Sequence, residues 1–196
     1  MGGKRLKVVV PLAATNQLIV DLGNKVQKSH ESAGQELPDI VSIPRTGLHI
    51  GPVIARMWGH DARRTLTAGV AKNEDGTFSD IQMPTSAQIS GRRLLVVDGV
   101  CKSGETLQHT VSSLKEAGAI SVKSAVLIHK TDEAAAGSGY VPDFFAEEDK
   151  LGAYNVFWWE IDEHMPTPTE QPMVSLPDIG QALAGQQGNG ALPHGA

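Results

Sequence analysis

Residues 94–106, with the sequence LLVVDGVCKSGET, run from an apolar strand through an acidic residue into a short polar loop that contains a glycine. The four apolar residues at 94–97 have the length and composition of a core strand. Leu107, Val111 and Leu114 then recur at helical spacing. In an open α/β sheet, ligands bind beyond the carboxyl ends of strands, where the backbone N–H groups of the next helix point at an anion. This segment therefore predicts a strand, a phosphate-binding loop and a helix.

The loop contains residue types that suit a phosphate. Gly104 lets the main chain approach an anion closely, Ser103 and Thr106 offer hydroxyl donors, and Lys102 adds a positive charge. The alternative is that Ser103 only caps the helix, and that Glu105 and Thr106 are ordinary residues of its first turn with no ligand to bind. The spacing matches neither a P-loop nor the three-glycine dinucleotide motif.

Strands and helices alternate along the rest of the chain. Hydrophobic periodicity and turn residues predict helices at about 14–29 and after Gly47, and strands at 39–43, 65–71, 92–98 and 122–129. The polar, turn-rich segment 72–90 is expected to be a mobile loop. This alternation predicts an α/β fold with a doubly wound, mainly parallel sheet and flanking helices.

Composition limits the domain organisation and the partners. The chain has 196 residues, of which 40% are hydrophobic, and we expect one domain over residues 1–163. Residues 164–196 are rich in Pro, Gly and Gln and are expected to form a disordered tail. A net charge of -5 without long single-sign runs argues against nucleic-acid or membrane partners. No apolar run could span a bilayer, and the single cysteine agrees with a cytoplasmic protein.

Several motifs resemble the type I phosphoribosyltransferases. Residues 93–107 resemble the family signature, in which a strand leads to two adjacent acids and a Thr-Gly-x-Thr loop that holds the 5-phosphate of phosphoribosyl pyrophosphate. Residues 43–48 resemble the family's pyrophosphate loop. The segments similar to the 6-oxopurine branch, the xanthine, guanine and hypoxanthine enzymes, are 126–130, 142–144 and 157–160. The resemblance covers about residues 39–163.

This resemblance implies a reaction and a set of partners. The phosphoribosyl group of phosphoribosyl pyrophosphate would be transferred to a 6-oxopurine-like base, and pyrophosphate would be released. The implied ligands are phosphoribosyl pyrophosphate, a nucleobase or nucleotide, and Mg²⁺ held largely by substrate oxygens. Relatives of this fold are often dimers or tetramers, so we expect a homodimer or homotetramer by analogy.

The resemblance also implies roles for the matched positions. Asp98 would bind the ribose hydroxyls and the metal, and Asp98 and Lys102 are the candidate catalytic residues. The expected phosphate site comprises Val100, Cys101, Lys102, Ser103, Gly104, Glu105 and Thr106. The expected pyrophosphate site comprises Pro44, Arg45, Thr46, Gly47 and Lys72. The expected base site comprises Lys130 as the donor to O6, Tyr154 as the stacking ring, and Asn155 and Val156 at the base edge. Alternatively, Lys130 is an ordinary solvated lysine and Tyr154 a core or interface aromatic.

Two positions depart from the family pattern and leave three hypotheses about the function open. Gly99 replaces the second acid, and Lys102 stands where many purine enzymes carry a third acid near the anomeric carbon. Exchanging that carboxylate for an ammonium reverses an interaction of about 4 kcal/mol at roughly 4 Å and an effective dielectric of about 20. Lys102 could still act as a base if burial lowered its pKa, or could bind a phosphate-rich ligand. The protein is then a purine phosphoribosyltransferase, a nucleotide-binding regulator that has lost its acids, or an enzyme acting on an unusual base or phosphosugar.

Overall fold

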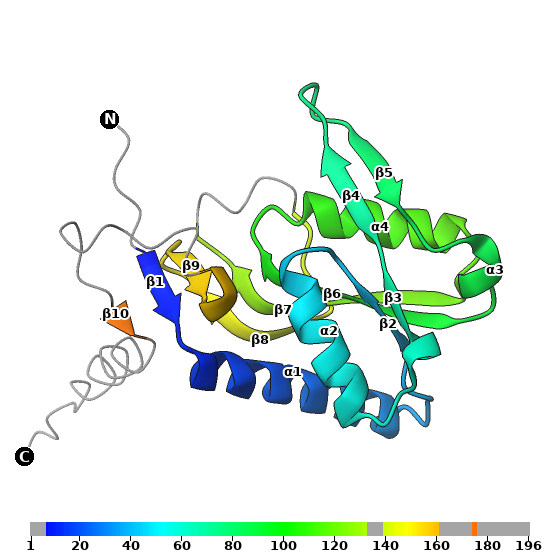
Figure 1. Cartoon of the computed structure of the whole chain (residues 1–196), viewed down its shortest axis with the longest axis horizontal. Coiled ribbons are helices and arrows are strands. Elements are labelled where there is room, and N and C mark those ends of the chain that lie inside the picture. Colours follow the sequence, from blue (N-terminus) through cyan, green and yellow to red (C-terminus); the bar gives the residue numbers. More distant parts are fainter. Residues whose placement is uncertain (1–6, 133–138, 161–173, 176–196) are drawn as a thin grey trace, which may run out of the picture. The chain divides into compact units, whose positions relative to one another are not determined.

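The computed structural model describes residues 7–132, 139–160 and 174–175 (Figure 1). The chain divides into two compact units. The larger unit comprises residues 17–152, and the smaller unit comprises residues 1–16 and 153–196. In the described part of the chain, no helix is both long and apolar enough to cross a membrane.

The larger unit is built on a five-stranded sheet with the order β3-β2-β6-β7-β8. Its strands are β2 (Asp39–Ser42), β3 (Thr65–Thr67), β6 (Arg93–Cys101), β7 (Ser121–Lys130) and β8 (Phe144–Asp149). Every pairing in this sheet is parallel, and Val96 of β6 lies opposite Val41 on one side and Ser124 on the other. The predicted α/β fold with a mainly parallel sheet is confirmed.

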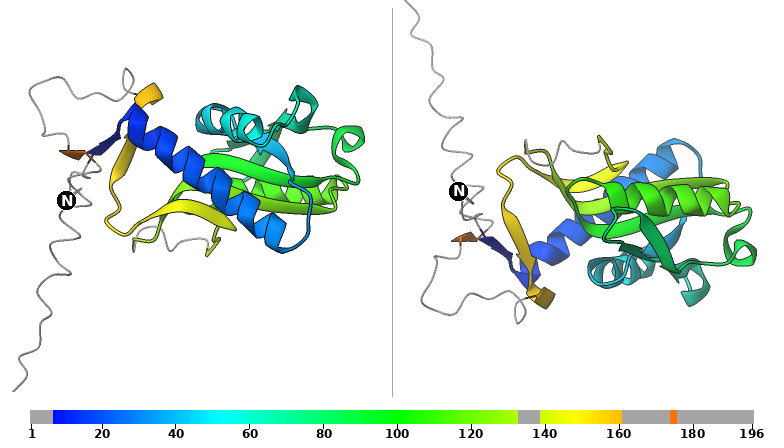
Figure 2. Two further views of the ribbon diagram at one scale, coloured as in Figure 1. Left: turned by 90° about the horizontal axis from the view of Figure 1, so that it is seen from below. Right: turned by 90° about the horizontal axis from the view of Figure 1, so that it is seen from above.

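Helices cover both faces of this sheet because its central strand is apolar on both faces. Residues 94–97 of β6 are at most 1% exposed. Leu94 and Val96 share a core cluster with Leu107 and Leu114 of α4 (Glu105–Glu116). Helix α2 (Thr46–Met57) packs against β2 and β6, and Figure 2 shows α1 (Leu12–Ser32) and α4 in front in opposite views. The carboxyl ends of the strands therefore meet at one edge, between the starts of α2 and α4.

The segment predicted to be a mobile loop is instead structured. Strand β4 (Gly69–Lys72) pairs in an antiparallel hairpin with β5 (Phe78–Gln82), and α3 (Ser86–Ile89) follows. The predicted strand at 65–71 is divided between β3 and β4, with the short helix η1 (Ala62–Arg64) before them. The expected turn is present, since the N–H of Asn73 donates to the carbonyl of Thr77 at 2.8 Å. The prediction missed the hairpin because β5 is polar and largely exposed.

The smaller unit contains a parallel sheet of three strands in the order β10-β1-β9. These are β1 (Lys7–Val10), β9 (Tyr154–Phe157) and β10 (Val174–Ser175), and the short helix η3 (Trp158–Glu160) follows β9. The predicted tail, residues 164–196, lies outside the described residues except for β10. That strand pairs with β1, which the sequence did not reveal.

Candidate functional site

The loop predicted to bind phosphate joins β6 to α4 and is shorter than expected. Strand β6 continues beyond Asp98, and its last residues, Val100 and Cys101, pair with β7. The Cys101 side chain is 1% exposed and belongs to the core, where burial raises the pKa of its thiol to about 11. Cys101 is therefore neither a strong nucleophile nor a side-chain ligand for phosphate. The loop proper consists of Lys102, Ser103 and Gly104.

Gly104 begins helix α4 in a left-handed conformation, with φ 74° and ψ 0°. A Cβ at this position would lie 2.8 Å from Tyr140, so glycine is needed for both conformation and space. No side chain caps the helix, and the Ser103 hydroxyl instead donates to Glu105 at 3.3 Å. The alternative in which Ser103 acts as the helix cap is wrong. Without a side-chain cap, the first amides of α4 remain suited to an anion, and Thr106 lies in this first turn.

The predicted pyrophosphate loop lies directly against the end of β6. A Cβ on Gly47 would lie 2.3 Å from the carbonyl oxygen of Val97, so only glycine allows this approach. Arg45, which follows Pro44, has φ 73° and ψ -105°, a conformation that costs a non-glycine residue about 1–3 kcal/mol. Helix α2 begins at Thr46 and, like α4, has no side-chain cap. Two helix starts suited to anions therefore flank the end of β6.

Asp98 is the carboxylate that β6 contributes to this edge of the sheet. It is partly buried, and its Oδ1 accepts a hydrogen bond of 2.7 Å from the N–H of Gly99. Gly99 offers no side chain, and the described residues contain no group of three His, Cys, Asp or Glu side chains that could hold a metal ion. One carboxylate fits a Mg²⁺ ion whose other ligands are water and substrate oxygens, and it does not fit an ion held by protein alone.

Lys72 reaches the phosphate loop from the β4–β5 hairpin. Its Nζ donates to Oε2 of Glu105, the first residue of α4, at 2.5 Å. This hydrogen bond lowers the pKa of the Glu105 carboxyl. The hairpin is also joined to α4 by His109, whose Nε2 lies 2.9 Å from Asp80 and whose ring stacks on Phe78. The structure thus brings Lys72 beside the predicted phosphate loop, although its partner could not be recognised from the sequence.

Lys130, the predicted donor to the base, ends β7 at the same edge of the sheet. Its side chain is 8% exposed, and its Nζ donates to Oδ2 of Asp149 on β8 at 2.8 Å. The alternative of an ordinary solvated lysine is therefore wrong. Asp149 was missed because it faces Lys130 through the register of two parallel strands, which a single sequence does not reveal.

The other predicted base contacts lie on β9 in the smaller unit. Tyr154 is 38% exposed, Asn155 is partly buried and Val156 is 2% exposed. Lys130 belongs to the larger unit. A base site shared by these residues stays a prediction.

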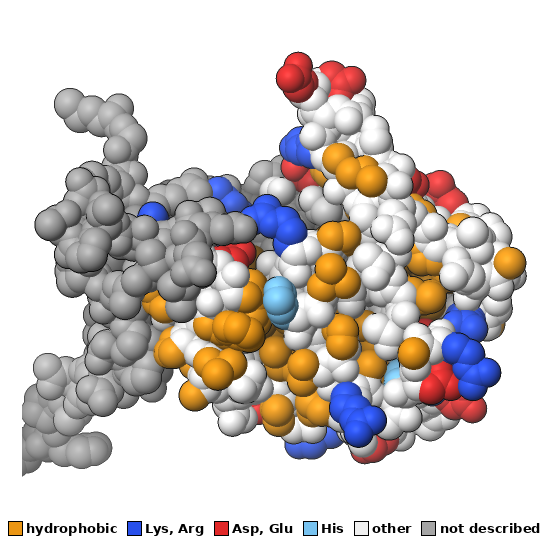
Figure 3. Space-filling model, viewed as in Figure 1, with side chains coloured by type: hydrophobic (Ala, Val, Ile, Leu, Met, Phe, Trp, Pro, Cys, Tyr) orange, Lys and Arg blue, Asp and Glu red, His pale blue; other side chains and the backbone are white. Residues whose placement is uncertain are grey.

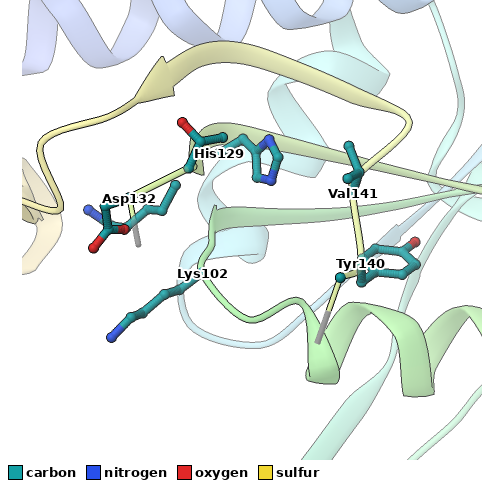
Figure 4. Close-up of a pocket in the computed structure, with 8 residues that line it drawn as sticks. Lys102, His129, Asp132, Tyr140 and Val141 are labelled. Carbon is teal, nitrogen blue, oxygen red and sulfur yellow. The ribbon is translucent and has the colours of Figure 1, made fainter. Parts of the chain in front are cut away.

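A cavity of about 180 Å³ opens beside the phosphate loop in the larger unit. Its walls include Lys102, His129, Lys130, Thr131, Asp132 and Tyr140. Figure 4 shows Lys102 and Asp132 on one side of the cavity, Tyr140 and Val141 on the other, and His129 between them. The hydroxyl of Tyr140 donates to Ser124 at 2.8 Å, which fixes the wall that also packs on Gly104.

A parallel sheet with uncapped helix starts and a carboxylate at one edge is typical of α/β proteins that bind phosphorylated ligands. The chain belongs to the phosphoribosyl transferase domain family, which matches residues 12–165. Its fold is that of the type I phosphoribosyltransferases, as the sequence resemblance implied.

Solved structures with this fold come from several organisms. A purine phosphoribosyltransferase of Pyrococcus horikoshii has a TM-score of 0.65 and 21% identity, with 84% of this chain and 99% of that chain covered. A xanthine-guanine-hypoxanthine phosphoribosyltransferase of Helicobacter pylori has a TM-score of 0.64 and 18% identity, with 79% and 96% covered. A hypothetical protein of Neisseria gonorrhoeae with bound ppGpp has a TM-score of 0.65 and 20% identity, with 83% and 96% covered. At these identities the likeness extends to the fold alone.

Among curated proteins, the transcriptional regulator GfcR of Methanocella arvoryzae is 27% identical over 95 residues. These residues are 46% of this chain and 45% of the regulator, so the match spans less than half of that protein.

Proposed function

We propose that the protein transfers the phosphoribosyl group of phosphoribosyl pyrophosphate to a 6-oxopurine-like base and releases pyrophosphate. The observation that carries this proposal is the meeting of two uncapped helix starts, at Thr46 and Glu105, beside the carboxylate of Asp98. One helix start suits the 5-phosphate and the other the pyrophosphate, because backbone amides bind anions without a lysine for each charge.

Each group of residues would bind a different part of the substrates. The amides that follow Lys102 would hold the 5-phosphate, and those that follow Arg45 would hold the pyrophosphate. Asp98 would position the ribose hydroxyls directly or through Mg²⁺, which would neutralise charge on the leaving pyrophosphate. Lys130, held in place by Asp149, would donate to the O6 atom of the base.

A second function is favoured by the same positions that depart from the family pattern. With glycine at 99 and lysine at 102, the end of β6 and its loop retain only Asp98 of the acids that a transferase of this type usually carries there. Such a site suits a protein that binds a phosphorylated nucleoside as a signal. The similarity to a transcriptional regulator and to a protein with bound ppGpp supports this alternative.

A turnover and binding experiment separates the two functions. Purified protein is incubated with phosphoribosyl pyrophosphate, Mg²⁺ and each common nucleobase, and nucleotide and pyrophosphate are quantified. Thermal shifts with phosphoribosyl pyrophosphate, GMP and ppGpp are measured in parallel. Turnover that Asp98→Asn abolishes supports the transferase, whereas stabilisation by nucleotide without turnover supports the regulator. If the protein shows no turnover and none of these ligands stabilises it, both proposed functions are contradicted.

Self-association is part of the proposal. Apolar side chains gather on the face seen in Figure 3, over α2, where Leu48, Val53 and Met57 are each 38–44% exposed. An apolar helix face of this kind suits contact with a second copy of the chain. Sedimentation of the wild type and of Val53→Asp tests whether a homodimer or homotetramer forms through this face.

A further inference from the structure

One face of the β4–β5 hairpin contacts one face of α4 (Figure 1). Lys72 and Phe78 are cross-strand partners, and Asp80 lies two residues beyond Phe78, so the three side chains share a face of the hairpin. Glu105 and His109 are four residues apart and share a face of α4. The two faces therefore meet over two successive turns of the helix.

A chain of contacts joins these five residues. Oδ1 of Asp80 lies 2.9 Å from Nε2 of His109, and the His109 ring stacks on Phe78 with centroids 5.1 Å apart. The centroid of the Phe78 ring in turn lies 5.7 Å from Nζ of Lys72, within the range of a cation–π contact, and this Nζ donates to Glu105. His109 is thus linked through Phe78 to the ammonium group beside the phosphate loop.

Packing of the hydrophobic core does not account for these contacts. Neither Phe78 nor His109 belongs to the core cluster that contains Leu94 and Leu107. The side chains of His109 and Asp80 are 30% and 43% exposed, and ion pairs at such positions contribute little to stability. A role in placing the hairpin and its lysine accounts for the contacts better.

Lys72 needs such placement if it is to bind a phosphate. A lysine side chain has four rotatable bonds, and much of their freedom is lost when the ammonium group is fixed by a ligand. A phosphate at the start of α4 would take this ammonium group over from Glu105. The link between Lys72 and α4 would then be lost, and the contacts of His109 would keep the hairpin on the helix.

We propose that His109 is a positioning residue, whose ring, stacked on Phe78 and paired with Asp80, holds the hairpin so that Lys72 reaches an anion at the start of α4. The inference rests on the proposed function, because it takes this helix start to be the site of a substrate or nucleotide phosphate. It requires no turnover, so it applies to the transferase and to the regulator alike. His109 acts on the ligand only through Phe78 and Lys72.

Binding of two phosphorylated ligands tests the inference. Phosphoribosyl pyrophosphate and GMP are each titrated by calorimetry into the wild type, Lys72→Met, His109→Ala and the double variant. Gln108→Ala is the matched control, because Gln108 is an exposed neighbour on α4. His109→Phe keeps a ring for Phe78 and is the conservative variant. Urea titrations establish that each variant is folded.

The expected result is a loss of affinity that is not additive. Lys72→Met should weaken binding about fivefold and His109→Ala about threefold, as the loss of partly exposed contacts would give. The double variant should bind about as weakly as Lys72→Met alone, because His109 acts through Lys72. His109→Phe should recover most of the affinity, and Gln108→Ala should match the wild type.

Three binding results would overturn the inference. The first is unchanged affinity in Lys72→Met or in His109→Ala. The second is a His109→Ala loss that is as large in the Lys72→Met background as in the wild type, because His109 would then act independently of the lysine. The third is a loss in His109→Phe equal to that in His109→Ala, because the stacked ring would then not matter.

Hydrogen exchange supplies a readout that needs no ligand. The amides of residues 69–82, among them the Asn73 N–H that donates to Thr77, should exchange faster in His109→Ala than in the wild type or in Gln108→Ala. An unchanged rate in His109→Ala would show that the hairpin does not depend on His109 for its place, and would contradict the inference.

Turnover separates the inference from the proposed transferase. His109→Ala should raise KM for phosphoribosyl pyrophosphate with little effect on kcat, as the loss of a binding contact would. Coupled losses of affinity without conversion of any base would contradict the transferase and leave the role of His109 standing. Turnover with additive losses would overturn the role of His109 and leave the transferase intact. Failure to bind either ligand would remove both.

Discussion

The ammonium group of Lys72 lies 2.5 Å from the carboxylate of Glu105, so the β4–β5 hairpin is tied to the first residue of α4. This contact places a negative side chain at a helix start that otherwise suits a phosphate. Both side chains are nearly half exposed, so the pair is accessible to solvent and to a ligand. A phosphate that bound here would compete with Glu105 for Lys72.

Replacing Glu105 with Gln should therefore strengthen phosphate binding. The substitution removes the competing charge and releases Lys72, so we expect phosphoribosyl pyrophosphate to bind about two- to fivefold more tightly. Isothermal titration of the variant and of Glu116→Gln, at the other end of α4, measures the effect. Weaker binding by Glu105→Gln alone would mean that Glu105 positions Lys72 or Ser103 for the ligand instead of competing with it.

Gly104→Ala should destabilise the fold and abolish phosphate binding. The new side chain would have to adopt a positive φ and its Cβ would lie 2.8 Å from Tyr140, so we expect a loss of about 2–4 kcal/mol in the free energy of unfolding. Gly76→Ala is a matched control, because Gly76 has φ 85° and a Cβ there would meet no heavy atom within 4 Å. It should cost only about 1–2 kcal/mol. Denaturant titrations compare the two, and equal losses would show that Tyr140 can move aside.

The sequence was sufficient to predict those parts of the fold whose signals are local. The apolar run before Asp98 and the helical spacing after it predict β6, α4 and the loop between them, and parallel pairing follows from the alternation of elements. The end of β6 was placed too early because Gly99 was interpreted as the start of a loop.

Features that depend on distant partners were not predictable in the same way. The pairing of Lys130 with Asp149 depends on strand register, and the contact of Lys72 with Glu105 depends on a hairpin whose second strand is polar. The strand β10 pairs with β1 across most of the chain length, and a two-residue strand has no pattern of its own. Such contacts require the fold to be known first.

Asp149→Ala should destabilise the protein more than the loss of a surface ion pair does. The substitution would leave Lys130, which is 8% exposed, without its carboxylate partner, and we expect a loss of about 3–5 kcal/mol. Glu148→Ala breaks a more exposed pair with Lys150 and should change stability little. Urea titrations of both variants give the comparison. If the two losses are equal and small, Lys130 reaches solvent easily and needs no fixed partner.

The buried thiol of Cys101 should make the stability of the protein depend on pH under alkaline conditions. Burial raises the pKa of its thiol from about 9 to about 11, so between these values the native state keeps a proton that the unfolded chain has lost. Stability should be fully present below pH 9 and should fall as pH rises toward 11, in the direction required when the unfolded state binds fewer protons. Cys101→Ala removes this titration and should flatten the decrease, as urea midpoints at several pH values would reveal. An equally steep decrease in the variant would assign the alkaline loss to other groups, of which Tyr140 is the first to examine because burial also raises its pKa.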